Sequence, residues 1–207
     1  MLAGNQGSPF ERIQWSADSK QLWVQTFEGT QVRLLNVNPT DGSFERFANH
    51  IQNFWRYSVS KDGRTVILNA ETDQCPPNLF VFAEGKQSRQ ITDMNPQLTQ
   101  FSLGNVREMM WKSKRDGRTI YGVVITPHDY QPGHPRPTIV ELHGGPTGWW
   151  WSWLGTYVSR GQYFASHGFV TFLPNPRGSA NLGVNFTEAN IGDWGGGDYR
   201  DVMDGVD

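Results

Sequence analysis

The chain has 207 residues, a length that allows one large domain or two small ones. Charged residues make up 18% of the chain and the formal net charge is −2, which argues against nucleic acid or an anionic membrane surface as a partner. The single cysteine excludes an internal disulfide framework and a multi-cysteine metal site, and no apolar run is long enough to cross a bilayer.

Short strands separated by turns are predicted throughout residues 1–104. Runs rich in apolar, β-branched and aromatic residues alternate with turn signals such as Asp-Gly and Glu-Gly. The first two runs predict a hairpin that turns near Gly29. The predicted strands are residues 21–26, 32–37, 44–47, 65–68, 79–82 and 89–92.

An internal repeat lies in the same half of the chain. Asp18 and Asp62, each two residues after a serine and each followed by alternating apolar residues, are 44 residues apart. Gly42 and Gly85 are 43 residues apart. A repeat of roughly 40–50 residues with several strands is typical of β-propeller blades, which stack because one blade cannot bury its own faces. We therefore predict all-β propeller blades for residues 1–104, with an ordinary antiparallel sandwich as the alternative.

The pattern changes after residue 104. Strands now alternate with segments of helical spacing, which indicates an α/β domain whose parallel strands are joined by crossover helices. We therefore place a domain boundary between residues 104 and 105. The predicted strands are residues 106–111, 119–125, 138–142 and 169–173, and the predicted helices are residues 154–166 and 199–206.

The run His143, Gly144, Gly145 and Pro146 directly follows the third of these strands. In open α/β sheets, ligands bind at the carboxyl ends of the strands. Glycines let the backbone approach a reacting carbonyl closely and aim an N–H group at it. Such a donor stabilises the oxyanion of acyl transfer by about 3–4 kcal/mol, and a His-Gly-Gly loop serves this purpose in α/β-hydrolases. A tight Gly-Gly-Pro turn is the alternative.

Two more motifs follow. One is Asn-Pro-Arg-Gly-Ser at residues 175–179, and the other is Gly-Asp-Trp-Gly-Gly-Gly-Asp-Tyr-Arg-Asp-Val-Met at residues 192–203. In this order after residues 143–146, they resemble the prolyl oligopeptidase family of serine peptidases, in the branch of acylaminoacyl-peptidases and dipeptidyl-peptidases. The resemblance covers nearly the whole chain, because this family places a β-propeller before its α/β-hydrolase domain.

The resemblance implies C-terminal propeller blades at residues 1–104, followed by the N-terminal part of an α/β-hydrolase domain at residues 105–207. It implies an active site between the two, a peptide substrate, acyl transfer through a serine ester, and no metal or organic cofactor. The Gly-x-Ser-x-Gly nucleophile elbow is absent from the sequence. In the family this elbow follows the helix that begins here at Asp198, so we expect all three triad residues beyond residue 207.

The chain is therefore interpreted as an internal piece of a larger enzyme, and we expect it to be inactive alone. The catalytic residues expected within it are Gly145, Gly144 and His143 of the oxyanion loop, with the backbone N–H of Gly145 as the donor. In some branches of the family a tyrosine at the position of His143 assists, so the side-chain role of His143 stays open. Two functional alternatives remain: an esterase on the same fold, and a non-catalytic propeller-containing binding protein.

Several other residues carry two interpretations each. Arg177 either binds a substrate carboxylate or holds the turn at residues 175–179 through backbone carbonyls. The acidic series near the end of the chain either forms a divalent-metal site or places Asp198 and Asp201 at the N–H groups of a helix start. This series comprises Asp193, Asp198, Asp201, Asp204 and Asp207. A dense group of tryptophans either walls a substrate pocket or packs the two domains together. This group comprises Trp149, Trp150, Trp151 and Trp153.

Overall fold

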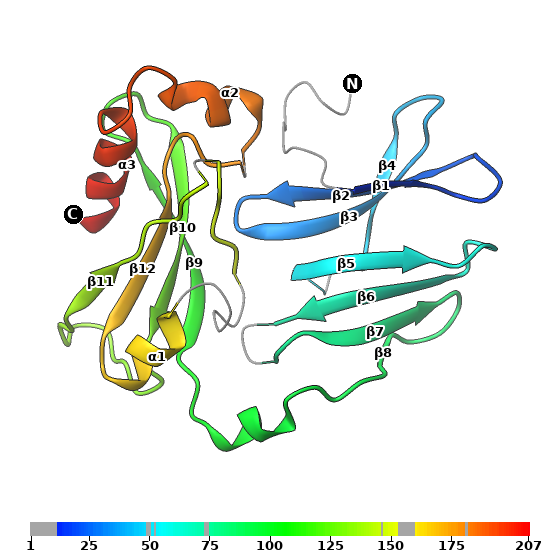
Figure 1. Ribbon diagram of the computed structural model, residues 1–207, viewed down its shortest axis with the longest axis horizontal. Coiled ribbons are helices and arrows are strands. Elements are labelled where there is room, and N and C mark those ends of the chain that lie inside the picture. Colours follow the sequence, from blue (N-terminus) through cyan, green and yellow to red (C-terminus); the bar gives the residue numbers. More distant parts are fainter. Residues whose placement is uncertain are drawn as a thin grey trace.

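The computed structural model describes residues 12–48, 51, 53–72, 75–145, 147–152, 160–180 and 182–207. Within these residues, the strands form three four-stranded sheets. Two sheets lie next to each other in one half of the molecule, and the third lies in the other half together with the helices near the C-terminus (Figure 1). Among the described residues, no helix combines the length and the apolar character needed to cross a bilayer.

The first sheet is an antiparallel meander in the order β1-β2-β3-β4. Glu28 pairs with Gln31, so the second and third strands are joined by the turn Gly29-Thr30. Gly29 has a φ of 61°, in the left-handed region that favours glycine. The hairpin predicted near this residue is therefore confirmed. The strands are β1 (Arg12–Trp15), β2 (Leu22–Glu28), β3 (Gln31–Val37) and β4 (Phe44–Phe47).

The second sheet repeats this order as β5-β6-β7-β8. The sequence repeat lies in equivalent turns of the two sheets. Asp18 accepts a hydrogen bond from Ser16 Oγ at 2.7 Å, and Asp62 accepts one from Ser60 Oγ at 2.6 Å. The repeat therefore encodes the turn of the first hairpin in each meander, an arrangement typical of propeller blades. The strands are β5 (Asn53–Val59), β6 (Thr65–Glu71), β7 (Asn78–Ala83) and β8 (Arg89–Gln90).

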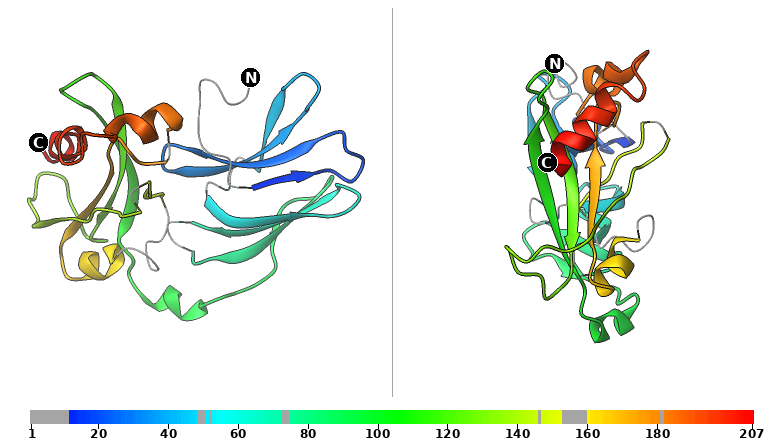
Figure 2. Two further views of the ribbon diagram at one scale, coloured as in Figure 1. Left: turned by 45° about the horizontal axis from the view of Figure 1, so that its top comes forward. Right: turned by 90° about the vertical axis from the view of Figure 1, so that its left-hand side faces the viewer.

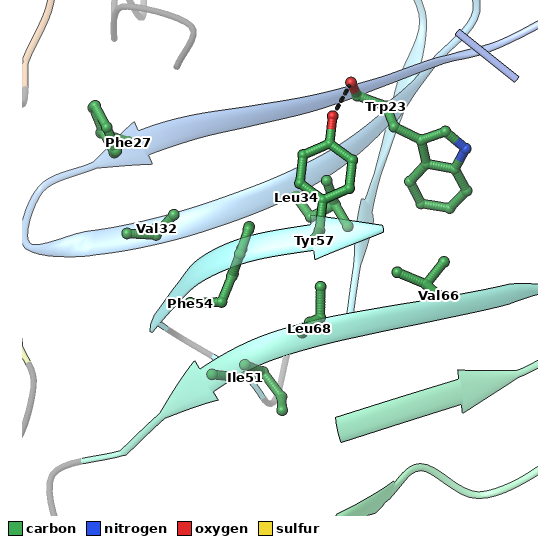
Figure 3. Close-up of a cluster of buried hydrophobic side chains, with 10 residues drawn as sticks. Trp23, Phe27, Val32, Leu34, Ile51, Phe54, Tyr57, Val66 and Leu68 are labelled. Carbon is green, nitrogen blue, oxygen red and sulfur yellow. Dashed lines mark hydrogen bonds between the residues drawn. The ribbon is translucent and has the colours of Figure 1, made fainter. Parts of the chain in front are cut away.

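The two meanders share one apolar core (Figure 3). Leu34 from β3 and Leu68 from β6 are 1% and 0% exposed within it. Tyr57 from β5 adds a polar link, because its hydroxyl donates a hydrogen bond to the carbonyl of Trp23 at 2.8 Å. Each meander thus buries its inner face against the other, as the stacking of propeller blades requires.

The third sheet has the order β11-β12-β10-β9. β11 runs parallel to β12, and the other two pairs are antiparallel. The chain reaches this sheet from the second meander through a long connection that contains η1 (Pro96–Gln100), drawn in green in Figures 1 and 2. The strands are β9 (Asn105–Lys112), β10 (Thr119–Thr126), β11 (Thr138–Val140) and β12 (Val170–Asn175).

Helices cover both faces of the third sheet. α1 (Gly161–Ser166), in the connection between the two parallel strands, packs Ala165 into a cluster with Leu173. Neighbouring Phe172 points to the opposite face, where α3 (Gly197–Val206) lies. A Cβ on Gly205 would lie 2.8 Å from the Phe172 ring, so only glycine lets this helix approach so closely. The short α2 (Val184–Thr187) and η2 (Glu188–Asn190) precede α3.

Every strand predicted from the sequence has a counterpart in the structure. Two strands were missed. β1 is mostly exposed, and β5 carries polar residues within its aromatic run. The described part of the helix predicted over residues 154–166 contains α1, and residues 153–159 lie outside the described residues. The last helix begins at Gly197, slightly before the predicted start.

Candidate active site

The loop at residues 143–145 follows β11 and carries an exposed backbone donor. Gly144 and Gly145 are exposed, whereas His143 is partly buried. Gly145 has a φ of 119°, and a Cβ there would lie 3.1 Å from Gly148 N. Within the described residues, the N–H of Gly145 has no hydrogen-bond acceptor. The loop therefore presents a glycine N–H to solvent at the carboxyl end of a parallel strand, as an oxyanion donor requires.

The side chain of His143 turns toward the Asn-Pro-Arg-Gly-Ser segment. Its Nε2 lies 2.9 Å from the hydroxyl oxygen of Ser179, and that hydroxyl donates to the carbonyl of Pro176 at 2.7 Å. Because a hydroxyl has one proton, this arrangement makes Nε2 the donor to Ser179. Burial lowers the pKa of His143, so its imidazole is neutral at neutral pH. These contacts anchor the loop through the histidine side chain.

A buried amide joins the segment after the loop to β12. Asn175, at the end of β12, is 0% exposed. Its Oδ1 accepts a hydrogen bond from Trp150 N at 2.6 Å, and its Nδ2 donates to Trp150 O at 2.7 Å. The indole of Trp150 donates to the carbonyl of Glu141 at 3.1 Å. The asparagine of the second motif therefore fixes the chain that leaves the first motif.

Two of the tryptophans pack the third sheet against the meanders. The ring of Trp149 lies 4.3 Å from that of Phe27, and the ring of Trp151 lies 5.0 Å from that of Trp55. A cavity of about 60 Å³ remains between these rings, far below the roughly 300–1,000 Å³ of ligand pockets. The packing interpretation is therefore favoured for Trp149 and Trp151. Trp153 lies outside the described residues.

Arg177 is buried in an ion-pair network at 4% exposure. Its Nε and Nη2 each donate to the carboxylate of Asp201 at 2.8 Å, and its Nη1 donates to Asp116 at 3.1 Å. The interpretation as a receptor for a substrate carboxylate is therefore wrong, because carboxylates of the protein already occupy the guanidinium. The interpretation as a structural arginine is confirmed, but its partners are carboxylates rather than backbone carbonyls.

Comparison with known proteins agrees with these motifs. Residues 156–207 match the model of the prolyl oligopeptidase family. This segment of the chain is therefore similar to the prolyl oligopeptidase family. The chain is 28% identical over 97% of its length to the uncharacterized peptidase YuxL of Bacillus subtilis. It is 25% identical over 98% of its length to dipeptidyl-peptidase 5 of Arthroderma otae. It spans 30% and 28% of the lengths of these two relatives.

The fold is also similar to that of a protein of known structure. The acylaminoacyl peptidase of Pyrococcus horikoshii superimposes with a TM-score of 0.78 at 23% sequence identity. The similarity covers 97% of this chain and 30% of that protein. The meanders, the third sheet and the helices are therefore arranged in the same way in both proteins.

Within the segment that matches the prolyl oligopeptidase family, the prediction of a helix start is confirmed for Asp198, which lies in the first turn of α3 and accepts a hydrogen bond from Tyr199 N at 2.8 Å. Asp201 is 0% exposed and pairs with Arg177, so its predicted place at the start of the helix is wrong. Asp193 takes that place, because its carboxylate accepts hydrogen bonds from Gly197 N at 3.1 Å and from Arg115 at 2.6 Å. These contacts lower the pKa of Asp193. The described residues contain no cluster of side chains suited to a metal ion.

Sequence reasoning missed a set of polar residues that join the loop region to the meanders. Ser152 N donates to Thr30 O at 2.8 Å, and Asn53 donates from its side-chain amide to the carbonyl of Ser152. Thr30 and Ser152 are 122 residues apart in the chain. A single sequence carries no signal for such a contact, because neither residue belongs to a recognisable motif.

Proposed function

We propose that this chain belongs to a serine-type peptidase that hydrolyses peptide bonds of short peptides. In this proposal, residues 1–104 are propeller blades and residues 105–207 are the N-terminal part of an α/β-hydrolase domain. The mixed third sheet, with its parallel pair at one edge and helices on both faces, supports the second assignment. The long connection through η1 supports the boundary between residues 104 and 105.

The proposed chemistry is acyl transfer. A serine hydroxyl attacks the substrate carbonyl, the N–H of Gly145 donates a hydrogen bond to the resulting oxyanion, and a serine ester forms before water releases the product. The observation that carries the proposal is the exposed glycine N–H, without an acceptor in the described residues, at the end of β11. Gly144 and His143 hold this donor in place. We propose that the nucleophile is supplied by sequence after residue 207.

The peptidase is favoured over an esterase by the names of both relatives, a peptidase and a dipeptidyl-peptidase. A non-catalytic binding protein would need neither an exposed Gly145 N–H nor the side chains that anchor the loop around it. The resemblance implies no cofactor, and acyl transfer by a serine needs none.

Covalent labelling with a fluorophosphonate tests the proposal. The protein that carries this chain together with its following sequence should be labelled at one serine within a Gly-x-Ser-x-Gly elbow and should cleave short peptides. The 207-residue chain alone should stay unlabelled. Labelling of Ser152 or Ser179 in this chain, or an elbow whose serine is replaced, would overturn the assignment.

Substitution of Gly145 tests the oxyanion donor. Gly145→Ala places a side chain at a φ of 119°, which turns the N–H away, and one lost donor lowers kcat by about 10²–10³-fold. Gly42→Ala is the control, because Gly42 has a φ of 74° in a meander turn with open space around it. A Gly145→Ala enzyme with the kcat of the control would remove the donor role.

A further inference from the structure

The N–H, the carbonyl and the hydroxyl of Ser152 all form hydrogen bonds with residues of the two meanders. Its N–H donates to Thr30 O at 2.8 Å, and its hydroxyl oxygen lies 2.6 Å from Thr30 Oγ1. Its carbonyl accepts a hydrogen bond from the side-chain amide of Asn53, which is 3% exposed. We call Thr30, Asn53 and Ser152, together with Glu108, the blade clamp.

Glu108 closes the clamp from the third sheet. Its Oε2 accepts hydrogen bonds from the N–H of Thr30 at 3.0 Å and from the Thr30 hydroxyl. Since the proton of that hydroxyl goes to the carboxylate, the hydroxyl of Ser152 donates to Thr30. Thr30 is 0% exposed whereas Glu108 is exposed, so these charge-assisted bonds are partly buried. The turn of the first meander is thereby tied both to β9 and to the segment after the loop.

The turn also fits closely against the third sheet. A Cβ on Gly29 would lie 3.0 Å from the Tyr121 ring and 3.1 Å from Glu108 Oε2. Only a residue without a side chain lets the turn come so near. The position of Thr30 relative to β9 and β10 is therefore set by shape as well as by hydrogen bonds.

The clamped segment leads directly to the loop at residues 143–145. Between them, Trp150 is fixed by Asn175, and the ring of His143 lies 6.1 Å from the ring of Trp150 in an edge arrangement. A Cβ on Gly148 would collide with the carbonyl of Gly144, so the two ends of the loop region are in contact. The segment that ends at Ser152 is therefore in contact with the glycines of the loop.

We propose that the blade clamp positions the oxyanion loop, so that docking of the propeller on the third sheet sets the geometry of the Gly145 N–H. Thr30 and Asn53 are positioning residues in this proposal, because they act through Ser152 and touch no reacting atom. The catalytic part of the proposal rests on the proposed function. Its structural part, that the clamp orders residues 143–152, can be measured without any activity.

Hydrogen exchange of the 207-residue chain tests the structural part. Thr30→Val removes the hydroxyl at constant shape and should speed amide exchange in residues 143–152 by about tenfold, the scale of one hydrogen bond to a charged group. Thr30→Ser keeps the hydroxyl and should restore slow exchange. Thr40→Val is the matched control, because Thr40 is exposed in a meander turn. Ser152→Ala breaks the same contact from the other side, should Thr30→Val fail to fold.

The kinetic arm uses the protein that includes the nucleophile. Thr30→Val should lower kcat by about tenfold and leave KM within about twofold, and Thr30→Ser should recover kcat. Unchanged exchange in Thr30→Val and Ser152→Ala, or faster exchange with unchanged kcat, would overturn the proposal. If the wild-type protein cleaves neither peptides nor esters, the proposed function falls, and exchange alone decides whether the clamp holds the loop.

Discussion

Two contacts in this molecule are built from opposite chemistry. Between the meanders, the buried side chains are apolar, with Leu34 and Leu68 at 1% and 0% exposed. Between the turn after β12 and α3, the buried contact is the ion pair of Arg177 with Asp201. Apolar burial stabilises without fixing direction, whereas a buried ion pair adds little net stability but fixes orientation when both partners are present. We infer that the meanders need close packing, whereas the loop region needs a fixed orientation.

Removing one partner of the ion pair should give the largest effect on stability. Asp201→Ala leaves the guanidinium of Arg177 buried with Asp116 as its remaining carboxylate partner. Loss of one member of a buried pair costs about 3–5 kcal/mol, because the other charge loses its compensation. Urea denaturation of the chain measures the change in the free energy of unfolding.

Asp198→Ala is the matched control for Asp201→Ala. Asp198 lies in the same helix but is only partly buried and outside the ion pair, so its removal should lower the free energy of unfolding by no more than about 1 kcal/mol. Equal losses in the two variants would mean that the ion pair contributes nothing specific, and the comparison between the two contacts would fail.

A cavity in the meander core tests the apolar contact. Leu68→Ala removes a side chain that is 0% exposed and should lower the free energy of unfolding by about 2–5 kcal/mol. Leu79→Ala, at a position 36% exposed on the neighbouring strand, should cost much less. Because the Leu68 side chain makes no directional bond, Leu68→Ala should leave hydrogen exchange at residues 143–152 unchanged. Faster exchange there would show that the two contacts are not independent.

Apart from β1 and β5, the strands of the meanders and of the third sheet could be predicted because their signals are local. Alternating apolar residues and turns such as the one at Asp62 report on neighbours within one hairpin. The loop glycines could be located because they follow a short apolar strand in a recognisable motif. The partner of Arg177 could not be predicted, since Asp201 is 24 residues away and its sequence position suggested a helix start. Thr30 and Asn53 carried no signal at all.

Glu71 lies where the meanders meet the third sheet, and it makes that contact sensitive to pH. The side chain is 2% exposed and accepts hydrogen bonds from the indoles of Trp55, at 2.8 Å, and Trp151. Burial raises the pKa of Glu71 from 4.5 to about 7, against the smaller opposing effect of the two indoles. The folded state therefore favours the protonated carboxyl, whereas the unfolded chain releases the proton near pH 4.5.

The free energy of unfolding should fall as the pH rises from 4.5 to about 7, and then stay low. The expected loss is about 3 kcal/mol, at roughly 1.4 kcal/mol for each pH unit between the two pKa values. Glu71→Gln keeps an oxygen acceptor without the charge, so it should match the wild type at pH 4.5 and be more stable by up to that amount at pH 8. Glu84→Gln, at an exposed site of the same meander, should follow the wild type throughout. Parallel curves for Glu71→Gln and the wild type would show that folding does not raise the pKa of Glu71, and would contradict the prediction.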